Sequence, residues 1–217
     1  MSQRKLDDSA GLRRESLADL GVHGVSLIFI VIACLALAAT LPGLDRLRGV
    51  GLVIYAFGLV ATFLFSALYN LTERTSPNSI LRRLDHAAIF IMIAGTYTPL
   101  ILFLMATGRG HFLLAFVWTG AVAGVIAKLF FPARFERYSV VAYLLLGWAI
   151  LGALVPIYNA LPLPGLLLLA GGGLFYSFGV IFHVKAHLPY QNALWHACVL
   201  AGAVCHFGLI YRFVALA

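Results

Sequence analysis

The sequence has 217 residues, of which 62% are hydrophobic and 11% are charged, and its mean hydropathy is +0.98. A water-soluble core of this size does not need such a composition, whereas a chain that crosses a bilayer several times does. The net charge of +7 is therefore interpreted loop by loop, as a marker of membrane topology, and it does not indicate a nucleic-acid partner.

The apolar runs divide the chain into a tail and a membrane domain. The first twenty residues are polar and of mixed sign, so no cleaved signal peptide is expected. We expect residues 1–20 to form the tail and residues 21–217 to form one domain. A membrane-spanning helix requires about 20 mostly apolar residues. The expected spans are 21–41, 49–70, 86–106, 112–131, 138–157, 163–182 and 193–214.

Small residues inside the spans are interpreted as packing residues. The sixth span contains Gly171, Gly172, Gly173 and Gly179, and this pattern favours a helix packed inside the bundle. The cysteines lie within apolar runs and have no CxxC spacing, so they are expected to be neither metal ligands nor disulfide partners. They are Cys34, Cys198 and Cys205.

The basic residues predict the orientation of the bundle. Eleven of the 15 Lys and Arg residues lie in the N-terminal tail and in the second-to-third, fourth-to-fifth and sixth-to-seventh connections. The other four lie on the opposite side. Because basic residues accumulate on the cytoplasmic side, we expect the N-terminus in the cytoplasm and the C-terminus outside.

Polar side chains gather at the cytoplasmic ends of several spans. A polar group in hydrocarbon is costly, so it usually faces a cavity or a partner. We therefore expect a water-accessible cavity there; the alternatives are solvation at the membrane interface and, for Asp85, a place in the first turn of a helix. His206 lies about 15 Å further along the seventh span than His196. It is expected to face the bundle interior and to form a hydrogen bond with another helix. The polar residues are Asp19, His23, Ser66, Asn70, Asp85, His86, His183, His187, Asn192 and His196, and for His183 and His187 solvation at the interface is the favoured alternative.

Four segments carry a family resemblance. ADLGVHGVS, SALYN, RRLDHAAIFIMIAGTYTP and NALWHACVLAGAVCHF are similar to the hemolysin III family, the bacterial branch of the progestin and adipoQ receptor superfamily. The resemblance covers all seven spans. It implies an all-α, seven-helix protein of the bacterial inner membrane with a cytoplasmic N-terminus.

The resemblance also implies a zinc site. In that superfamily, zinc is held by a histidine at the end of span two and by two histidines spaced HxxxH at the start of span seven. A serine four residues before the first histidine and an aspartate at the start of span three complete the site. Carried over, these are Ser66, Asp85 and the last histidine, His196, whereas the other two ligand positions hold Asn70 and Asn192.

The two asparagines predict weak zinc binding. Catalytic zinc typically has three protein ligands drawn from His, Cys, Asp and Glu, and a neutral carboxamide oxygen suits harder cations better. We therefore expect substoichiometric zinc. His23 and His86 are candidate substitutes, although His86 lies about 100° around the helix from Asp85.

Two functions are compatible with these observations. The first is a non-catalytic membrane protein that binds a lipid or small amphiphile, or that acts as a channel or cytolytic protein. The second is a zinc-dependent hydrolase of a lipid amide or ester, similar to a ceramidase, in which Asp85 takes a proton and Ser66 orients the water. The missing ligands favour the first, with membrane lipids as the expected partners.

Overall fold

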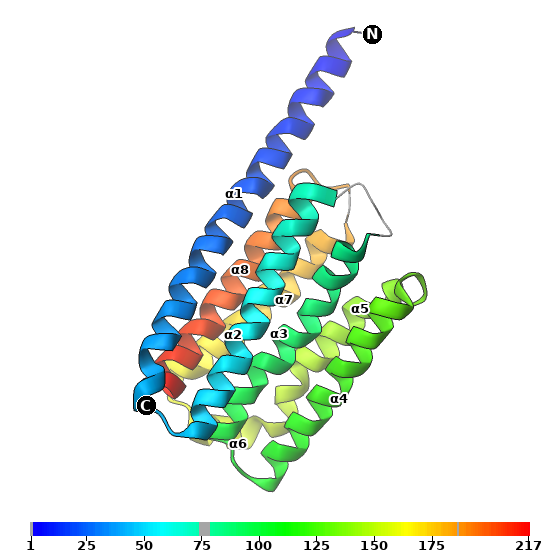
Figure 1. Ribbon diagram of the computed structural model, residues 1–217. Coiled ribbons are helices and arrows are strands. Elements are labelled where there is room, and N and C mark those ends of the chain that lie inside the picture. The colour runs from blue at the N-terminus through cyan, green and yellow to red at the C-terminus, as the bar shows by residue number, and fades with distance from the viewer. Residues whose placement is uncertain (1, 74–78, 186) are drawn as a thin grey trace.

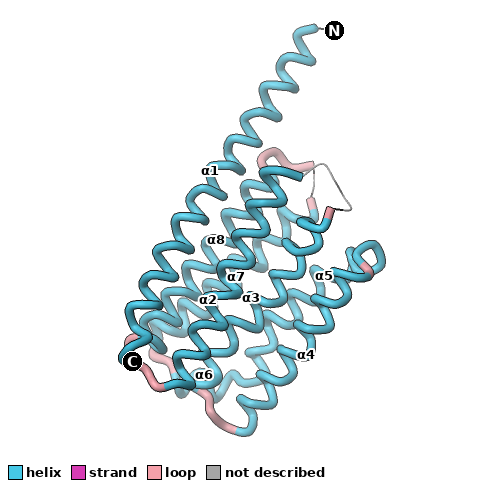
Figure 2. The backbone as a smooth tube through the Cα atoms, in the orientation of Figure 1, coloured by secondary structure: helices cyan, strands magenta, loops and turns pink. Residues whose placement is uncertain are grey.

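The computed structural model describes residues 2–73, 79–185 and 187–217, and every regular element within these ranges is helical (Figures 1 and 2). Among these residues, seven helical segments are long and apolar enough to cross a membrane, which confirms the expected number of spans. They are Arg13–Gly43, Arg46–Thr72, Ile80–Leu104, Gly108–Phe130, Pro132–Ala160, Leu163–Val184 and Gln191–Ala215.

The first helix is longer than the first span. Helix α1 (Ser2–Thr40) runs without a break through the polar tail, and its beginning projects beyond the other helices (Figure 1). The two termini lie at opposite ends of the bundle, as an odd number of spans requires. We call the end at which α1 begins the N-terminal end.

The remaining elements follow in chain order, with short turns of other helical types between or after them. They are η1 (Leu41–Gly43), α2 (Arg46–Leu68), η2 (Tyr69–Glu73), α3 (Ile80–Leu104), α4 (Gly108–Phe130), α5 (Pro132–Gly147), η3 (Trp148–Ala153), α6 (Leu154–Ala160), α7 (Leu163–Val184), α8 (Gln191–Ile210) and η4 (Tyr211–Ala215).

Local sequence explains where these helices begin. The side chain of Asp45 accepts hydrogen bonds from two backbone amides in the first turn of α2, and Ser79 and Thr107 each accept one at the start of α3 and α4. Pro132 occupies the first position of α5, where its missing amide hydrogen costs nothing.

Helix α3 is the centre of the bundle. In its most apolar 18-residue stretch, 67% of the helix is buried. Helix α3 packs against α2, α4, α5 and α8. In the corresponding stretch of helix α7 only 17% is buried, and α7 packs mainly on α8. The expectation that the sixth span lies inside the bundle is therefore wrong. Its glycines allow close approach on two sides: Gly172 and Gly179 lie against α8, under His206 and beside Trp195, and Gly173 lies against Trp148 of η3.

The fifth span is interrupted between α5 and α6, within the membrane-spanning part of the chain. The hydroxyl of Tyr97, on α3, donates to the carbonyl of Gly147 and accepts from the amide of Ile150, both at 2.8 Å. The break leaves a backbone carbonyl and a backbone amide without partners in the helix, and the Tyr97 hydroxyl forms a hydrogen bond with each. Lipid tails could not supply these hydrogen bonds. The indole of Trp148 donates to Ser177 Oγ at 2.9 Å and ties the break to α7.

Candidate functional site

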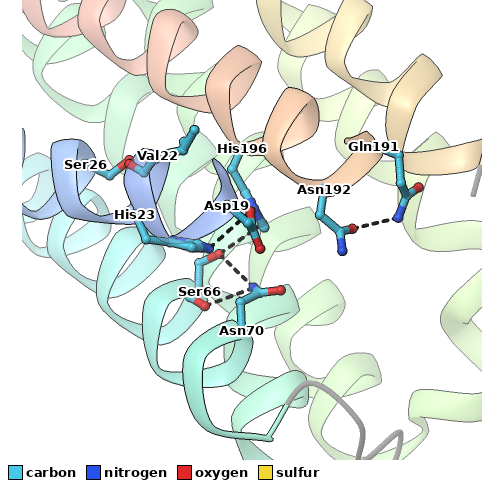
Figure 3. Close-up of polar contacts among 9 residues, drawn as sticks. All are labelled: Asp19, Val22, His23, Ser26, Ser66, Asn70, Gln191, Asn192 and His196. Atoms are coloured by element: carbon cyan, nitrogen blue, oxygen red, sulfur yellow. Dashed lines mark hydrogen bonds and ion pairs between the residues drawn. The ribbon is translucent and has the colours of Figure 1, made fainter. Parts of the chain in front are cut away.

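Four polar side chains from three helices meet near the N-terminal end of the bundle (Figure 3). Asp19 and His23 lie one turn apart on α1 and therefore share a face, while Ser66 comes from α2 and His196 from α8. All four are buried, with between 1% and 8% of their surface exposed. Burial of so many polar groups is costly unless they bond one another or a ligand.

These side chains form a connected series. The Oδ1 atom of Asp19 lies 2.7 Å from Nδ1 of His196, and Nε2 of His196 lies 3.4 Å from Oγ of Ser66. His23 Nε2 is 3.8 Å from the same Asp19 oxygen, and its ring centroid is 4.4 Å from that of His196. A carboxylate only accepts, so Nδ1 of His196 carries the hydrogen of its bond to Asp19.

Asn70 and Asp85 complete the surroundings of Ser66. The Nδ2 group of Asn70 donates to the Ser66 carbonyl at 2.9 Å and lies 3.5 Å from Ser66 Oγ. The Asp85 side chain interacts with the Ser66 hydroxyl and lies near His196. The Ser66 hydroxyl therefore lies between the Asp85 carboxylate and the imidazole of His196.

Two cavities of different character meet at this cluster. One, of about 130 Å³, is lined mainly by apolar and aromatic side chains and reaches from Ser66 and His196 toward Trp148 and His206. The other, of about 240 Å³, is more polar; we call it the vestibule. Asp85 and His196 line both cavities, so the cluster marks the junction between a polar and an apolar space.

The predicted site residues are thus brought together, with differences among them. Asn70, Asp85, His86, Asn192 and His196 all line the vestibule, and Ser66 adjoins it through its contacts with Asn70 and His196. Asn192 accepts a hydrogen bond from Gln191 at 2.7 Å, and Figure 3 shows it set apart from the cluster.

Two further predicted residues have other partners. Nδ1 of His86 lies 3.0 Å from Nζ of Lys128, a buried lysine that also pairs with Glu136 at 2.7 Å. Nε2 of His206 bonds the Leu169 carbonyl on α7 at 3.2 Å, which confirms the expected bond to another helix.

The zinc ligand positions implied by the resemblance do not fit zinc here. Asn70, Asn192 and His196 do line one vestibule, but only His196 has a good zinc donor. The amide nitrogen of Asn70 is directed to Ser66, and the amide oxygen of Asn192 is bonded to Gln191.

A different set of side chains could hold a metal ion. One ligand atom each of Asp19, His23 and His196 lies within 4.8 Å of the others. The Asp19–His196 contact of 2.7 Å is shorter than the edge of about 3.3 Å that a tetrahedral zinc with ligands at 2.0–2.1 Å requires. An ion at this position would therefore have to replace that hydrogen bond.

Asp19 was expected among the polar residues of the cavity, but sequence reasoning gave it neither a role in the site nor a partner. Its partner, His196, is 177 residues away in the chain, so no local pattern shows the contact. The available signal was its spacing of four residues from His23, which places both side chains on one face of α1.

The comparisons with known proteins agree with this fold. A family model described as haemolysin-III related matches residues 15–207. "Hemolysin-3" of Bacillus cereus is 35% identical over 203 residues, covering 93% of this chain and 92% of the relative. "Hemolysin-3 homolog" of Bacillus subtilis (strain 168) is 33% identical, covering 89% and 92%.

More distant relatives are animal proteins. Human "Monocyte to macrophage differentiation factor" is 26% identical over 169 residues, covering 74% of this chain and 69% of the relative. No solved structure matches significantly. With the family match over nearly the whole chain and seven helices able to cross a membrane, this multi-pass membrane protein belongs to the haemolysin III family.

Proposed function

We propose that this protein binds a single-chain amphiphile at the junction of its two cavities. The polar head occupies the vestibule, near Asp85 and His196, and the chain enters the apolar cavity. The observation that carries this proposal is the direct apposition of a polar and an apolar space at one buried cluster. Ligand sites typically combine such an apolar body with a few convergent polar groups.

The size of the apolar cavity limits the ligand. Its volume of about 130 Å³ is below the range of about 300–1,000 Å³ usual for drug-sized ligands. Because a cavity of about 150 Å³ takes up a molecule the size of benzene, only a segment of one alkyl chain fits within this cavity, and a two-chain lipid does not. The ligand class is therefore a fatty acid, a fatty-acyl ester or a similar single-chain molecule.

A cavity-filling substitution tests binding. Val199 lines the apolar cavity, and Val141 on α5 is 56% exposed on the outer surface of the bundle. In lipid nanodiscs, Val199→Trp should weaken saturable binding of a fluorescent fatty acid by about tenfold or more, a loss of at least about 1.4 kcal/mol. Val141→Trp is the matched control and should bind like the wild type. Equal binding by both variants, each shown to be folded by its melting temperature, contradicts the proposal.

A metal-dependent hydrolase is the second candidate, favoured by the gathering of Asp19, His23 and His196. A metal held there would supply an activated water and polarise a substrate carbonyl. Asp85 would accept a proton and Ser66 would orient the reacting groups. Stoichiometric metal in purified protein, lost in His23→Ala, would place this candidate first, and metal-free protein would dismiss it.

A further inference from the structure

An open groove on the outer surface of the bundle lies apart from the apolar cavity and the vestibule. It has a volume of about 640 Å³ and is formed by α1, α7 and α8. We propose that this groove and Arg14 together bind a phospholipid from the leaflet at the N-terminal end of the bundle. One acyl chain lies in the groove and the phosphate lies at Arg14. This site does not depend on the proposed amphiphile site.

The lining of the groove suits an acyl chain. None of the residues that line it has a nitrogen or oxygen atom in its side chain. Val25, Phe175 and Val204 are between 43% and 57% exposed on helices that can cross a membrane, so this surface faces lipid. Small residues such as Gly21 and Ala201 leave a hollow there. Unless an acyl chain fills the hollow, its lining atoms lose dispersion contacts.

Arg14 lies on the same face of α1 as the groove. Ala18, Gly21, Val22 and Val25 line the groove from α1. Arg14 precedes Ala18 by four residues, which places it on that face one turn nearer the N-terminus. Its side chain is exposed, and within the part of the chain that the structure describes it pairs with no carboxylate.

The depth of Arg14 matches the head-group region. Helices α1 and α8 pack together and run in the same direction (Figure 1), and Asp19 contacts His196. Because each helix rises about 1.5 Å per residue, Arg14 lies level with Gln191, the first residue of α8. Val25 lies about 16 Å further along α1 than Arg14. That distance is close to half of the hydrocarbon thickness of about 30 Å, so the groove spans the acyl chains of one leaflet.

The guanidinium of Arg14 selects the head group. Arg binds phosphate through two parallel N–H···O bonds and is more weakly hydrated than Lys, so it keeps this contact at a membrane surface. The stem of a long basic side chain can lie along apolar surface while its charge stays among the head groups. The groove therefore accepts the chain of any lipid, and Arg14 favours lipids that carry a phosphate.

A phospholipid at this place supports the contact between α1 and α8 from outside. Val22 and Ala197 line the groove, and their chain neighbours His23 and His196 belong to the buried cluster on the inner side. In its most apolar stretch α1 is only 22% buried, so the lipid covers surface that the protein leaves open. Because a ligand of the folded state stabilises that state, the lipid should hold α1 in place.

Photo-crosslinking tests the site. Delipidated protein in a maltoside detergent receives phosphatidylglycerol that carries a diazirine in one acyl chain, and mass spectrometry maps the adducts. We expect saturable crosslinks at Val25 and Val204. Unlabelled phosphatidylglycerol should compete, whereas inorganic phosphate should not. A diacylglycerol with the same diazirine chain but no phosphate should label the groove more weakly.

Paired variants separate the phosphate contact from general effects of charge. Arg14→Gln should lower the groove crosslinks about fivefold, the loss expected for one basic residue near a membrane surface. Arg13→Gln is the matched control, because Arg13 is also exposed and lies about 100° around α1 from Arg14. Phosphatidylglycerol should raise the melting temperature of the wild type by at least about 2 °C and that of Arg14→Gln by less.

A second pair tests the groove itself. A Cβ added at Gly21 or at Gly24 meets nothing within 4 Å, and Leu favours a helix more than Gly does, so both leucine variants should fold. Gly21→Leu fills the groove and should abolish the crosslinks at Val25 and Val204. Gly24→Leu is the control, because Gly24 is exposed on the same helix but does not line the groove.

The outcomes decide each part of the proposal. Crosslinks spread evenly over the lipid-facing surface, or crosslinks unchanged in Gly21→Leu, overturn the groove as a site. Equal labelling by the diacylglycerol probe, competition by inorganic phosphate, or equal losses in Arg13→Gln and Arg14→Gln overturn the assignment of a phospholipid. If Gly21→Leu does not fold, the wild-type crosslink map decides. Val199→Trp should leave these crosslinks unchanged, because Val199 lines the apolar cavity and not the groove.

Discussion

At the scale of single residues, the site differs from the family pattern by two imidazoles. Asn70 and Asn192 stand where the resemblance implies histidines, and both line the vestibule with His196. The structure gives each asparagine a hydrogen-bond partner, so the polar lining persists without a metal.

Restoring both histidines should restore a zinc site. The double variant Asn70→His, Asn192→His should purify with about one zinc per chain and melt at a higher temperature in added zinc, because a metal that binds only the folded state stabilises it. Each single variant should gain much less, since two imidazoles hold zinc weakly. Metal analysis of the wild type and the three variants, purified identically, measures this. A double variant that stays zinc-free would show that the three positions do not converge.

The residues of the site were unequally predictable. Ser66, Asp85 and His196 could be assigned because short motifs identify their positions. The contact of Asp19 with His196 could not be predicted, because it depends on the packing of α1 against α8. The contact of His86 with Lys128 could not be predicted either. The sequence places Lys128 among the basic residues of the fourth-to-fifth connection, whereas the structure buries it beside His86.

At the scale of elements, hydropathy predicts the spans and tertiary contacts decide their details. The expected span at 138–157 is in fact α5, a 3-10 turn and α6, and the side chain that stabilises this break, Tyr97, lies on another helix. The glycines of the sixth span indicate close packing correctly, yet they indicate neither its partner nor how much of α7 is buried.

The interrupted fifth span gives a prediction of stability. Tyr97→Phe removes the hydroxyl that bonds Gly147 and Ile150 and leaves two backbone groups without that partner. The cost should be about 1–3 kcal/mol in the free energy of unfolding and should appear as a lower melting temperature in detergent. The control is Tyr158→Phe, because Tyr158 is 67% exposed, and it should melt like the wild type. An unchanged melting temperature in Tyr97→Phe would contradict this account of the break.

At the scale of the whole molecule, the seven helices place the two termini at opposite ends. The distribution of basic residues predicts which end is cytoplasmic, and the site would then open toward the cytoplasm. A reporter fused after Ala217 should behave as extracytoplasmic in bacterial cells, and one fused before Ser2 should behave as cytoplasmic. The reverse result would place the vestibule on the outer side of the membrane.

The central claim is that the buried cluster of Asp19, Ser66 and His196 serves a bound amphiphile and not a zinc ion. Native mass spectrometry of the protein purified in a mild detergent without chelator tests both parts at once. We predict a chain that carries one single-chain amphiphile and no zinc, with the amphiphile lost in Val199→Trp. A chain that carries one zinc and no amphiphile, with the zinc lost in His196→Ala, would contradict it.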